Sequence, residues 1–303
     1  MRHAHVVSRK LVVASIATFI FVLLELAAGL FASSLALIGD ALHNFTDTLA
    51  LLLALFAVRL ERRPATAAKS YGYQRAGVIA AFINAGTLVA FTIFIFFEAI
   101  QRLRVEHPVN ALWMMITAAV AIVLNGAITW SLHAEGRTDL NIRSAVLHML
   151  GDTVSSAGII AAAILIRVTA MPFWDPLVSM LIGVMILWSS WGILREALNL
   201  LLEGTPAGID PDAVTRSLAA IDGVYGVHHL HIWALGHSRA ALSCHLMVGD
   251  IAVKTTGTLL DRVNQMLTDT YRIAHTTIQF EFANCDVDDP YCVPYSAADG
   301  RSE

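Results

Sequence analysis

Charged residues are scarce in this chain. Asp, Glu, Lys and Arg make up 15% of its 303 residues, whereas about a quarter is usual for a soluble protein. The formal net charge of −4 is small, so no nucleic-acid partner is expected. Cysteine is also scarce, and three residues do not make a disulfide framework: Cys244, Cys285 and Cys292. The composition therefore argues against an ordinary soluble protein.

Hydrophobic residues account for 56% of the chain and are concentrated in its first two-thirds. They occur in runs of about 20 residues, the length that a helix needs to cross a bilayer. The first run is too long for a secretory signal and no small-residue cleavage site follows it, so we expect no cleavable signal peptide. We predict a polytopic α-helical membrane protein with six transmembrane helices in residues 1–202, at roughly 11–31, 35–58, 76–98, 110–132, 142–166 and 174–194.

Basic residues flank these spans unevenly. One side carries the N-terminal segment and the links after the second and fourth spans, with Arg2, Arg9, Lys10, Arg59, Arg62, Arg63, Lys69, Arg75, Arg137 and Arg143. The other side carries mainly Arg102, Arg104 and Arg167. Because cytoplasmic loops of membrane proteins are enriched in Lys and Arg, we expect both termini in the cytoplasm.

From about residue 203 the pattern changes to that of a small soluble domain. Glycine and proline interrupt the chain between 204 and 211, and Asp210 is the expected N-cap of a helix over 211–221. The rest predicts two strands, a helix and a third strand, at 227–234, 240–248, 255–272 and 276–282. We expect an α+β, ferredoxin-like α-β-β-α-β domain over 203–285, followed by a loose tail over 286–303.

The same ionisable pair occurs at the same spacing in two apolar spans. His43 precedes Asp47 by four residues, and His148 precedes Asp152 by four. Side chains four residues apart share one face of a helix. Two such faces together offer two imidazoles and two carboxylates, a tetrahedral donor set for Zn(II). With a divalent ion the charges sum to zero, which lowers the cost of burial in an apolar interior.

The alternative interpretation is that each His–Asp pair is an independent structural contact. The occurrence of the same pair on two spans favours a shared metal site. Asp40 lies three residues before His43, on the same helix face. It could serve as a fifth ligand, a proton relay or a supporting partner of the ligands, and we favour the supporting role. Asp175 is expected to cap the sixth span. Since His and Asp bind metal only when deprotonated, protons and metal compete, which predicts proton-coupled antiport.

Histidine is also concentrated in the C-terminal domain, at His228, His229, His231, His237, His245 and His275. Strand alternation puts His229 and His231 on one face and His228 on the other. With Glu281, Cys285 and Cys292 nearby, the pattern predicts one or two further metal sites. The alternative is a chance excess of His on a solvated sheet face. Cys244 alternates with His245 and is expected in the core.

With these motifs the chain resembles the cation diffusion facilitator family, in the zinc-transporting branch that includes bacterial cobalt–zinc–cadmium efflux proteins. The motifs that carry the resemblance cover almost the whole length: Ser34 to His43 (SLALIGDALH) through Asp47, Tyr71 to Arg75 (YGYQR), Leu147 to Asp152 (LHMLGD), Asp175 to Leu177 (DPL) and His229 to Trp233 (HLHIW). The resemblance implies that His43, Asp47, His148 and Asp152 form the transport site, and that His43 selects zinc and cadmium.

The resemblance also implies a homodimer, joined through cytoplasmic domains that bind zinc for structure or regulation. His228, His245 and Glu281 match the family's cytoplasmic ligands, and Cys285 and Cys292 match a cysteine pair of related exporters. Position 279 is Gln where some members have His, and the His-rich loop of eukaryotic members is nearly absent. The chain is therefore expected in a bacterial inner membrane.

Three classes of function would use buried metal ligands. The leading one is a proton-coupled exporter of Zn(II), with Cd(II) and Co(II) as further substrates. An intramembrane metalloprotease would need a His-Glu-x-x-His helix, which this sequence lacks. A metal sensor would account for the C-terminal domain, but it would give the two intramembrane pairs no purpose.

Overall fold

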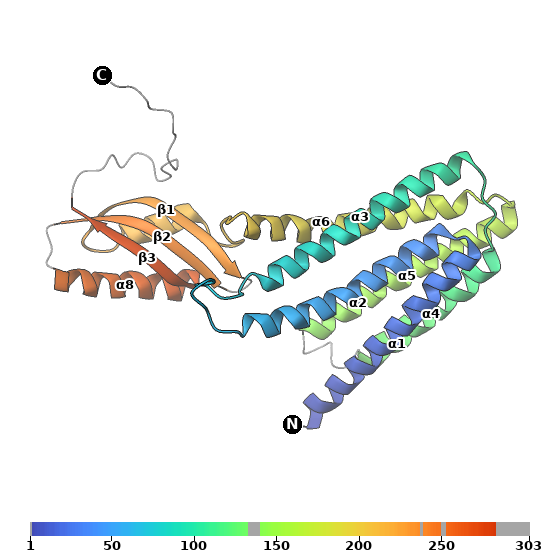
Figure 1. Cartoon of the computed structure of the whole chain (residues 1–303), viewed down its shortest axis with the longest axis horizontal. Coiled ribbons are helices and arrows are strands. Elements are labelled where there is room, and N and C mark those ends of the chain that lie inside the picture. The colour runs from blue at the N-terminus through green and yellow to red at the C-terminus, as the bar shows by residue number, and fades with distance from the viewer. Residues whose placement is uncertain (1, 133–139, 237–238, 250–252, 283–303) are drawn as a thin grey trace, which may run out of the picture. The chain divides into compact units, whose positions relative to one another are not determined.

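The computed structural model describes residues 2–132, 140–236, 239–249 and 253–282. The described residues divide into two compact units, one from residues 2–55 with 81–194 and the other from residues 56–80 with 195–282. The first unit is helical and the second contains the sheet (Figure 1).

Six long helices precede the sheet, as predicted. They are α1 (Arg2–Ala32), α2 (Leu35–Glu61), α3 (Ala76–Arg104), α4 (Ala111–Leu132), α5 (Leu140–Thr169) and α6 (Trp174–Leu201). In the described part of the chain, α2 to α6 contain stretches long and apolar enough to cross a membrane, and α1 adds a shorter apolar stretch over Ile16–Ala32. Large apolar side chains such as Val123 and Trp188 point outward. Such a surface requires lipid around it, so the chain is an integral membrane protein.

The helices pack through small residues. α4 contacts α1 and α5, and Figure 1 shows α2 alongside them. Ala118, Ala162 and Ala163 are completely buried in the shared core. On the other side, α6 approaches α3 closely at Gly183, where a Cβ atom would lie 3.1 Å from the Thr92 side chain. Small side chains allow helix backbones to approach closely where lipid gives no hydrophobic driving force.

The N-terminus of α2 is capped by a side chain from another helix. Asp175, at the start of α6, accepts hydrogen bonds from Ser34 Oγ at 2.6 Å, Leu35 N at 2.7 Å and Ala36 N at 3.2 Å. The sequence-based prediction that Asp175 caps α6 is therefore wrong. The position of Asp175 at the start of α6 suggested that it caps α6. The Asp175 carboxylate instead satisfies the free backbone donors of α2.

The second unit contains the predicted α-β-β-α-β order. Its elements are α7 (Pro211–Ala219), β1 (Val224–Gly236), β2 (Arg239–Val248), α8 (Val253–Tyr271) and β3 (Ile273–Glu281). The strand order is β1-β2-β3, with β1 antiparallel and β3 parallel to β2. Apolar residues of both helices and the sheet form one core, including Leu218, Leu242, Val263 and Leu267. Asp210 caps α7 as predicted, accepting from Asp212 N at 3.0 Å.

The link between α2 and α3 packs against the ends of the strands, within this second unit. Arg75 donates to Glu203 at 3.1 Å and to the carbonyl of Ala234 at 3.5 Å. Tyr71 contacts His275, with its hydroxyl 3.4 Å from Nε2. A Cβ atom at Gly236 would lie 2.6 Å from the carbonyl oxygen of Gln74, so only glycine fits there.

Candidate metal centres

The structure brings the two His-x-x-x-Asp pairs together. His43 and Asp47 lie one turn apart on α2, and His148 and Asp152 lie one turn apart on α5. The Nε2 atom of His43 lies 3.6 Å from Asp47 Oδ2 and 3.9 Å from Asp152 Oδ1. The Nε2 atom of His148 lies 3.2 Å from Asp47 Oδ2 and 3.6 Å from Asp152 Oδ2. Four donors from two helices thus surround one small volume.

These separations suit a small divalent ion. Bonds of about 2.0–2.1 Å in a tetrahedral zinc site place the ligand atoms about 3.4 Å apart. The four measured distances, between 3.2 and 3.9 Å, bracket that value. The donor atoms of His43, His148 and Asp152 all lie within 4.8 Å of one another. Asp47 lies within 3.6 Å of both histidines but outside this mutual group, so its carboxylate would have to move towards Asp152 to complete a tetrahedral site.

The site is buried on one side and open on the other. The side chain of Asp152 is 5% exposed and that of His43 is 19% exposed, whereas that of His148 is 41% exposed. His148 is therefore the least covered of these three side chains.

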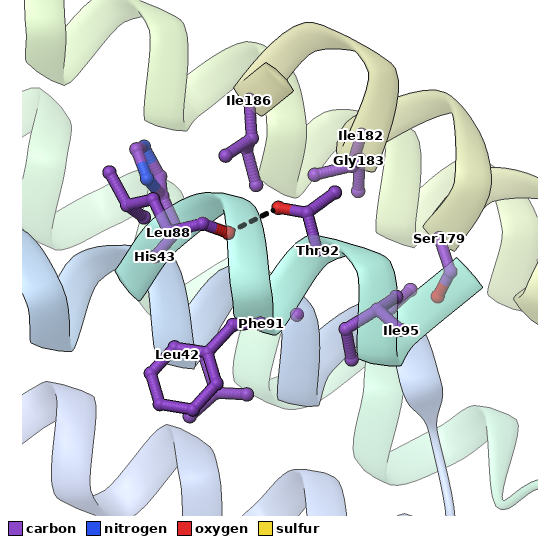
Figure 2. Close-up of a pocket in the computed structure, with 12 residues that line it drawn as sticks. Leu42, His43, Leu88, Phe91, Thr92, Ile95, Ser179, Ile182, Gly183 and Ile186 are labelled. Atoms are coloured by element: carbon purple, nitrogen blue, oxygen red, sulfur yellow. Dashed lines mark hydrogen bonds between the residues drawn. The ribbon is translucent and has the colours of Figure 1, made fainter. Parts of the chain in front are cut away.

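A second pocket next to His43 is not suited to a metal. It measures about 20 Å³ and lies between α2, α3 and α6, with mostly apolar walls (Figure 2). The Thr92 hydroxyl in its wall donates to the carbonyl of Leu88 at 2.8 Å. Figure 2 shows Ser179 and His43 at opposite ends of it. The space suffices for about one water molecule but offers no converging donors.

Asp40 does not belong to the four-donor set. Its carboxylate is buried between α2 and α5, where Oδ1 accepts a hydrogen bond from Ser155 Oγ at 2.6 Å. Ser155 follows Asp152 by three residues, and Asp40 precedes His43 by three. The contact therefore joins the two ligand-bearing helices beside the site.

A second cluster lies on the sheet of the other unit. His228 of β1 is paired with His245 of β2, and Glu281 ends β3. Glu281 lies 2.9 Å from His228 Nε2 and 2.8 Å from His245 Nδ1. Gln279 donates to the same carboxylate at 2.7 Å and thereby orients it. The three predicted residues that the structure describes thus meet on adjacent strands.

His229 joins this cluster, contrary to the strand alternation. A register shift falls between His228 and His231, and His229 has a positive φ of 50°. As a result the His229 ring stacks on His245 with centroids 4.6 Å apart. The donor atoms of His228, His229 and His245 lie within 4.8 Å of one another. The clustering of histidines was the only signal for His229, because alternation predicts no bulge.

The remaining predicted residues of this domain differ in outcome. His231 is exposed opposite Ser243, and His275 contacts Tyr71. Cys244 is buried in the core, as expected, and burial raises the pKa of its thiol to about 12, which disfavours the thiolate that binds metals. His237, Cys285 and Cys292 lie outside the described residues.

The electrostatics of the cluster favour metal binding. Burial lowers the pKa of His245, and the neighbouring His229 and His228 lower it further, against the opposing effect of Glu281. A neutral imidazole is the form that binds a metal ion. His245 is therefore available as a ligand at neutral pH.

Comparison with known proteins identifies the family. Residues 11–202 match the cation efflux transmembrane domain, and residues 206–283 match the cytoplasmic domain of cation efflux proteins. Zinc transporter ZitB of Pectobacterium atrosepticum is 39% identical over 93% of this chain and 88% of its own length. Metal cation efflux system protein CzcD of Cupriavidus metallidurans is 38% identical over 92% of this chain and 88% of its own.

Two further matches extend this comparison. The cadmium, cobalt and zinc/H(+)-K(+) antiporter of Bacillus subtilis is 33% identical over 86% of this chain and 85% of its own length. The solved metal-bound C-terminal domain of the Cupriavidus CzcD transporter is 40% identical, covers 24% of this chain and 100% of its own, and has a TM-score of 0.23. The chain belongs to the cation efflux family, the cation diffusion facilitators, whose members are metal transporters and not enzymes.

Proposed function

We propose that this protein exports Zn(II), and also Cd(II) and Co(II), from the cytoplasm in exchange for protons. The transport site consists of His43, Asp47, His148 and Asp152. The observation that carries the proposal is the convergence of these four donors from α2 and α5, with His–Asp distances of 3.2 to 3.9 Å. The names of the relatives, which include zinc, cadmium and cobalt, support the same substrates.

The donor chemistry favours these ions over harder ones. Two imidazole nitrogens with two carboxylate oxygens suit Zn(II), Cd(II) and Co(II), whereas an all-oxygen site suits Mg(II) or Mn(II). Two carboxylates balance the charge of one divalent ion when both imidazoles are neutral. The loaded site is then neutral, which lowers the free-energy cost of its burial within the bundle.

Proton exchange follows from the same ligands. Both histidines and both aspartates must be deprotonated to bind the metal, so each ion bound displaces protons and each proton bound weakens the metal. A more acidic outer side would therefore favour release of the metal there. The name of the Bacillus relative, which includes H(+), agrees with this exchange.

The C-terminal cluster serves a different purpose in this proposal. His228, His229, His245 and Glu281 hold zinc in the cytoplasm, with Cys285 and Cys292 as further candidate ligands. Zinc there stabilises or regulates a homodimer that forms through domain 203–285. The membrane domain, 1–202, then lies in the bacterial inner membrane with both termini in the cytoplasm, and lipid surrounds its apolar surface.

Zinc flux into liposomes under an imposed pH gradient tests the central proposal. The wild-type protein should accumulate zinc, and Asp47→Ala and Asp152→Ala should each abolish accumulation because either change removes a ligand. His107→Ala, an exposed histidine outside both clusters, is the matched control and should transport normally. Normal flux in both aspartate variants would overturn the site, and zinc binding without any wild-type flux would indicate a sensor.

A further inference from the structure

Glu25 is a buried acid that the proposed transport site does not use. It lies on α1 within the apolar stretch Ile16–Ala32, and its side chain is completely buried. Neither carboxylate oxygen makes a hydrogen bond of good geometry among the residues that the structure describes, although the Asn44 amide is close enough to interact with it. Its carboxyl group lies beside Asp40 and Asn44 of α2. An isolated carboxylate in this environment would cost several kcal/mol, so the group needs a partner or a proton.

Asp40 cannot neutralise Glu25, because it is an acid too. Asp40 is 1% exposed, and while Oδ1 accepts from Ser155, Oδ2 has no partner in the described part of the chain. The other charged groups near the pair are Asp152 of α5, close to both acids, and His43 of α2, close to Asp40. The sequence of α4, which packs on α1, contains no titratable residue. Among the side chains that the structure describes, no permanently charged base therefore faces the two acids.

Two adjacent carboxyl groups in a low-dielectric interior share a proton, because both cannot ionise at once. A proton on either acid also lets it donate a hydrogen bond to the other, which pairs oxygens that otherwise have no partner. We propose that Glu25 and Asp40 form a proton-binding site, separate from the four metal donors, whose proton is exchanged during metal transport. This inference rests on the proposed proton-coupled function and assigns one of its protons.

The position of the pair gives it a way to respond to the metal. Asp40 shares its helix face with His43, and through Ser155 it touches the helix that carries Asp152. A divalent ion at the metal site cancels the negative charge of the two ligand carboxylates, which favours loss of the proton from the pair. When the ion leaves, the uncompensated carboxylates of the site favour rebinding of a proton. By linkage, a proton on the pair weakens metal binding by the same free energy.

Glu25→Gln tests this assignment, since glutamine preserves shape and mimics the neutral acid. In purified protein, the variant should bind zinc but release fewer protons per ion than the wild type. In liposomes it should retain zinc/zinc exchange within about twofold of the wild-type rate, while accumulation driven by a pH gradient falls on the order of 10- to 100-fold. Glu98→Gln is the matched control, because Glu98 pairs with Arg102 at 2.9 Å on α3, and it should release protons normally.

Infrared difference spectroscopy provides a second test that does not depend on the folding of a variant. Zinc binding to the wild-type protein should remove the band of a protonated carboxyl group, and Asp40→Asn, which can still accept from Ser155, should lack that change. Unaltered proton release and pH-driven accumulation in Glu25→Gln, or no protonated carboxyl in the wild type, would overturn the inference. Absence of pH-driven flux in the wild type would instead overturn the proposed function.

Discussion

At the scale of single residues, the two metal clusters use histidine in different settings. His43 and His148 lie on helices, where a spacing of four residues alone aligns each with an aspartate. His228 and His229 are adjacent on a strand, where alternation normally separates neighbours. The positive φ of His229 turns its ring to the side of its neighbour. Local backbone geometry is therefore part of the second cluster.

The backbone conformation of His229 predicts that His229 binds zinc and that His231, on the same strand, does not. In an Asp152→Ala background, which removes the transport site, His229→Ala should weaken zinc binding to the full-length protein by about 10- to 100-fold. His231→Ala, an exposed control on the same strand, should bind zinc as before. Titration calorimetry with zinc measures both. Equal losses in the two variants would exclude a specific role of His229.

At the scale of elements, one aspartate joins two helices. Asp175 of α6 accepts hydrogen bonds from Ser34, which precedes α2, and from the first two residues of α2, the helix that carries His43 and Asp47. The preceding turn is held as well, because Arg102 of α3 donates to the carbonyl of Ser33 at 2.6 Å. The axial position of the two ligands thus depends on contacts at the end of their helix.

Removal of this cap should affect both stability and transport. Asp175→Ala leaves the Ser34 hydroxyl and two backbone donors without their acceptor, at a cost of about 1–3 kcal/mol for each buried group left unpaired. Asp175→Asn keeps one acceptor oxygen and should lose less. Thermal unfolding in detergent and zinc flux are the measurements, with Ser34→Ala as the single-bond control. An alanine variant as stable and active as the wild type would contradict this role.

At the scale of the whole molecule, segments distant in sequence form the second unit. The link after α2, the end of α6 and the C-terminal domain belong to it together. Arg75 bridges the link to Glu203, but Glu203 is 67% exposed in this ion pair. Exposed ion pairs contribute about 0–1 kcal/mol. The close approach of Gln74 to Gly236 is therefore the stricter constraint on this packing.

Gly236→Ala tests that constraint. Its Cβ would meet the Gln74 carbonyl at 2.6 Å, a backbone atom that cannot rotate away. We expect destabilisation of about 1–3 kcal/mol, the usual effect of overpacking. Glu203→Ala should cost less than about 1 kcal/mol. Thermal unfolding compares the two, and an equal or reversed order would show that the link is not held by this contact.

Much of this architecture was predictable from the sequence because it depends on local patterns. Apolar runs of bilayer length indicated the six helices, and alternation with helical periodicity indicated the α-β-β-α-β order. The spacing of His43 and Asp47, repeated at His148 and Asp152, predicted which side chains share a face. These features require only the periods of helix and strand.

Tertiary structure decided the contacts that no period contains. A bulge placed His229 beside His245, Asp175 capped α2 instead of its own helix, and Glu25 came to lie beside Asp40. In each case the contact joins residues on different elements, and the contact of His229 also requires an irregular backbone. The sequence determined which residues share a face, and only the packing of the faces decided which groups meet, because that choice depends on the free energy of the whole fold.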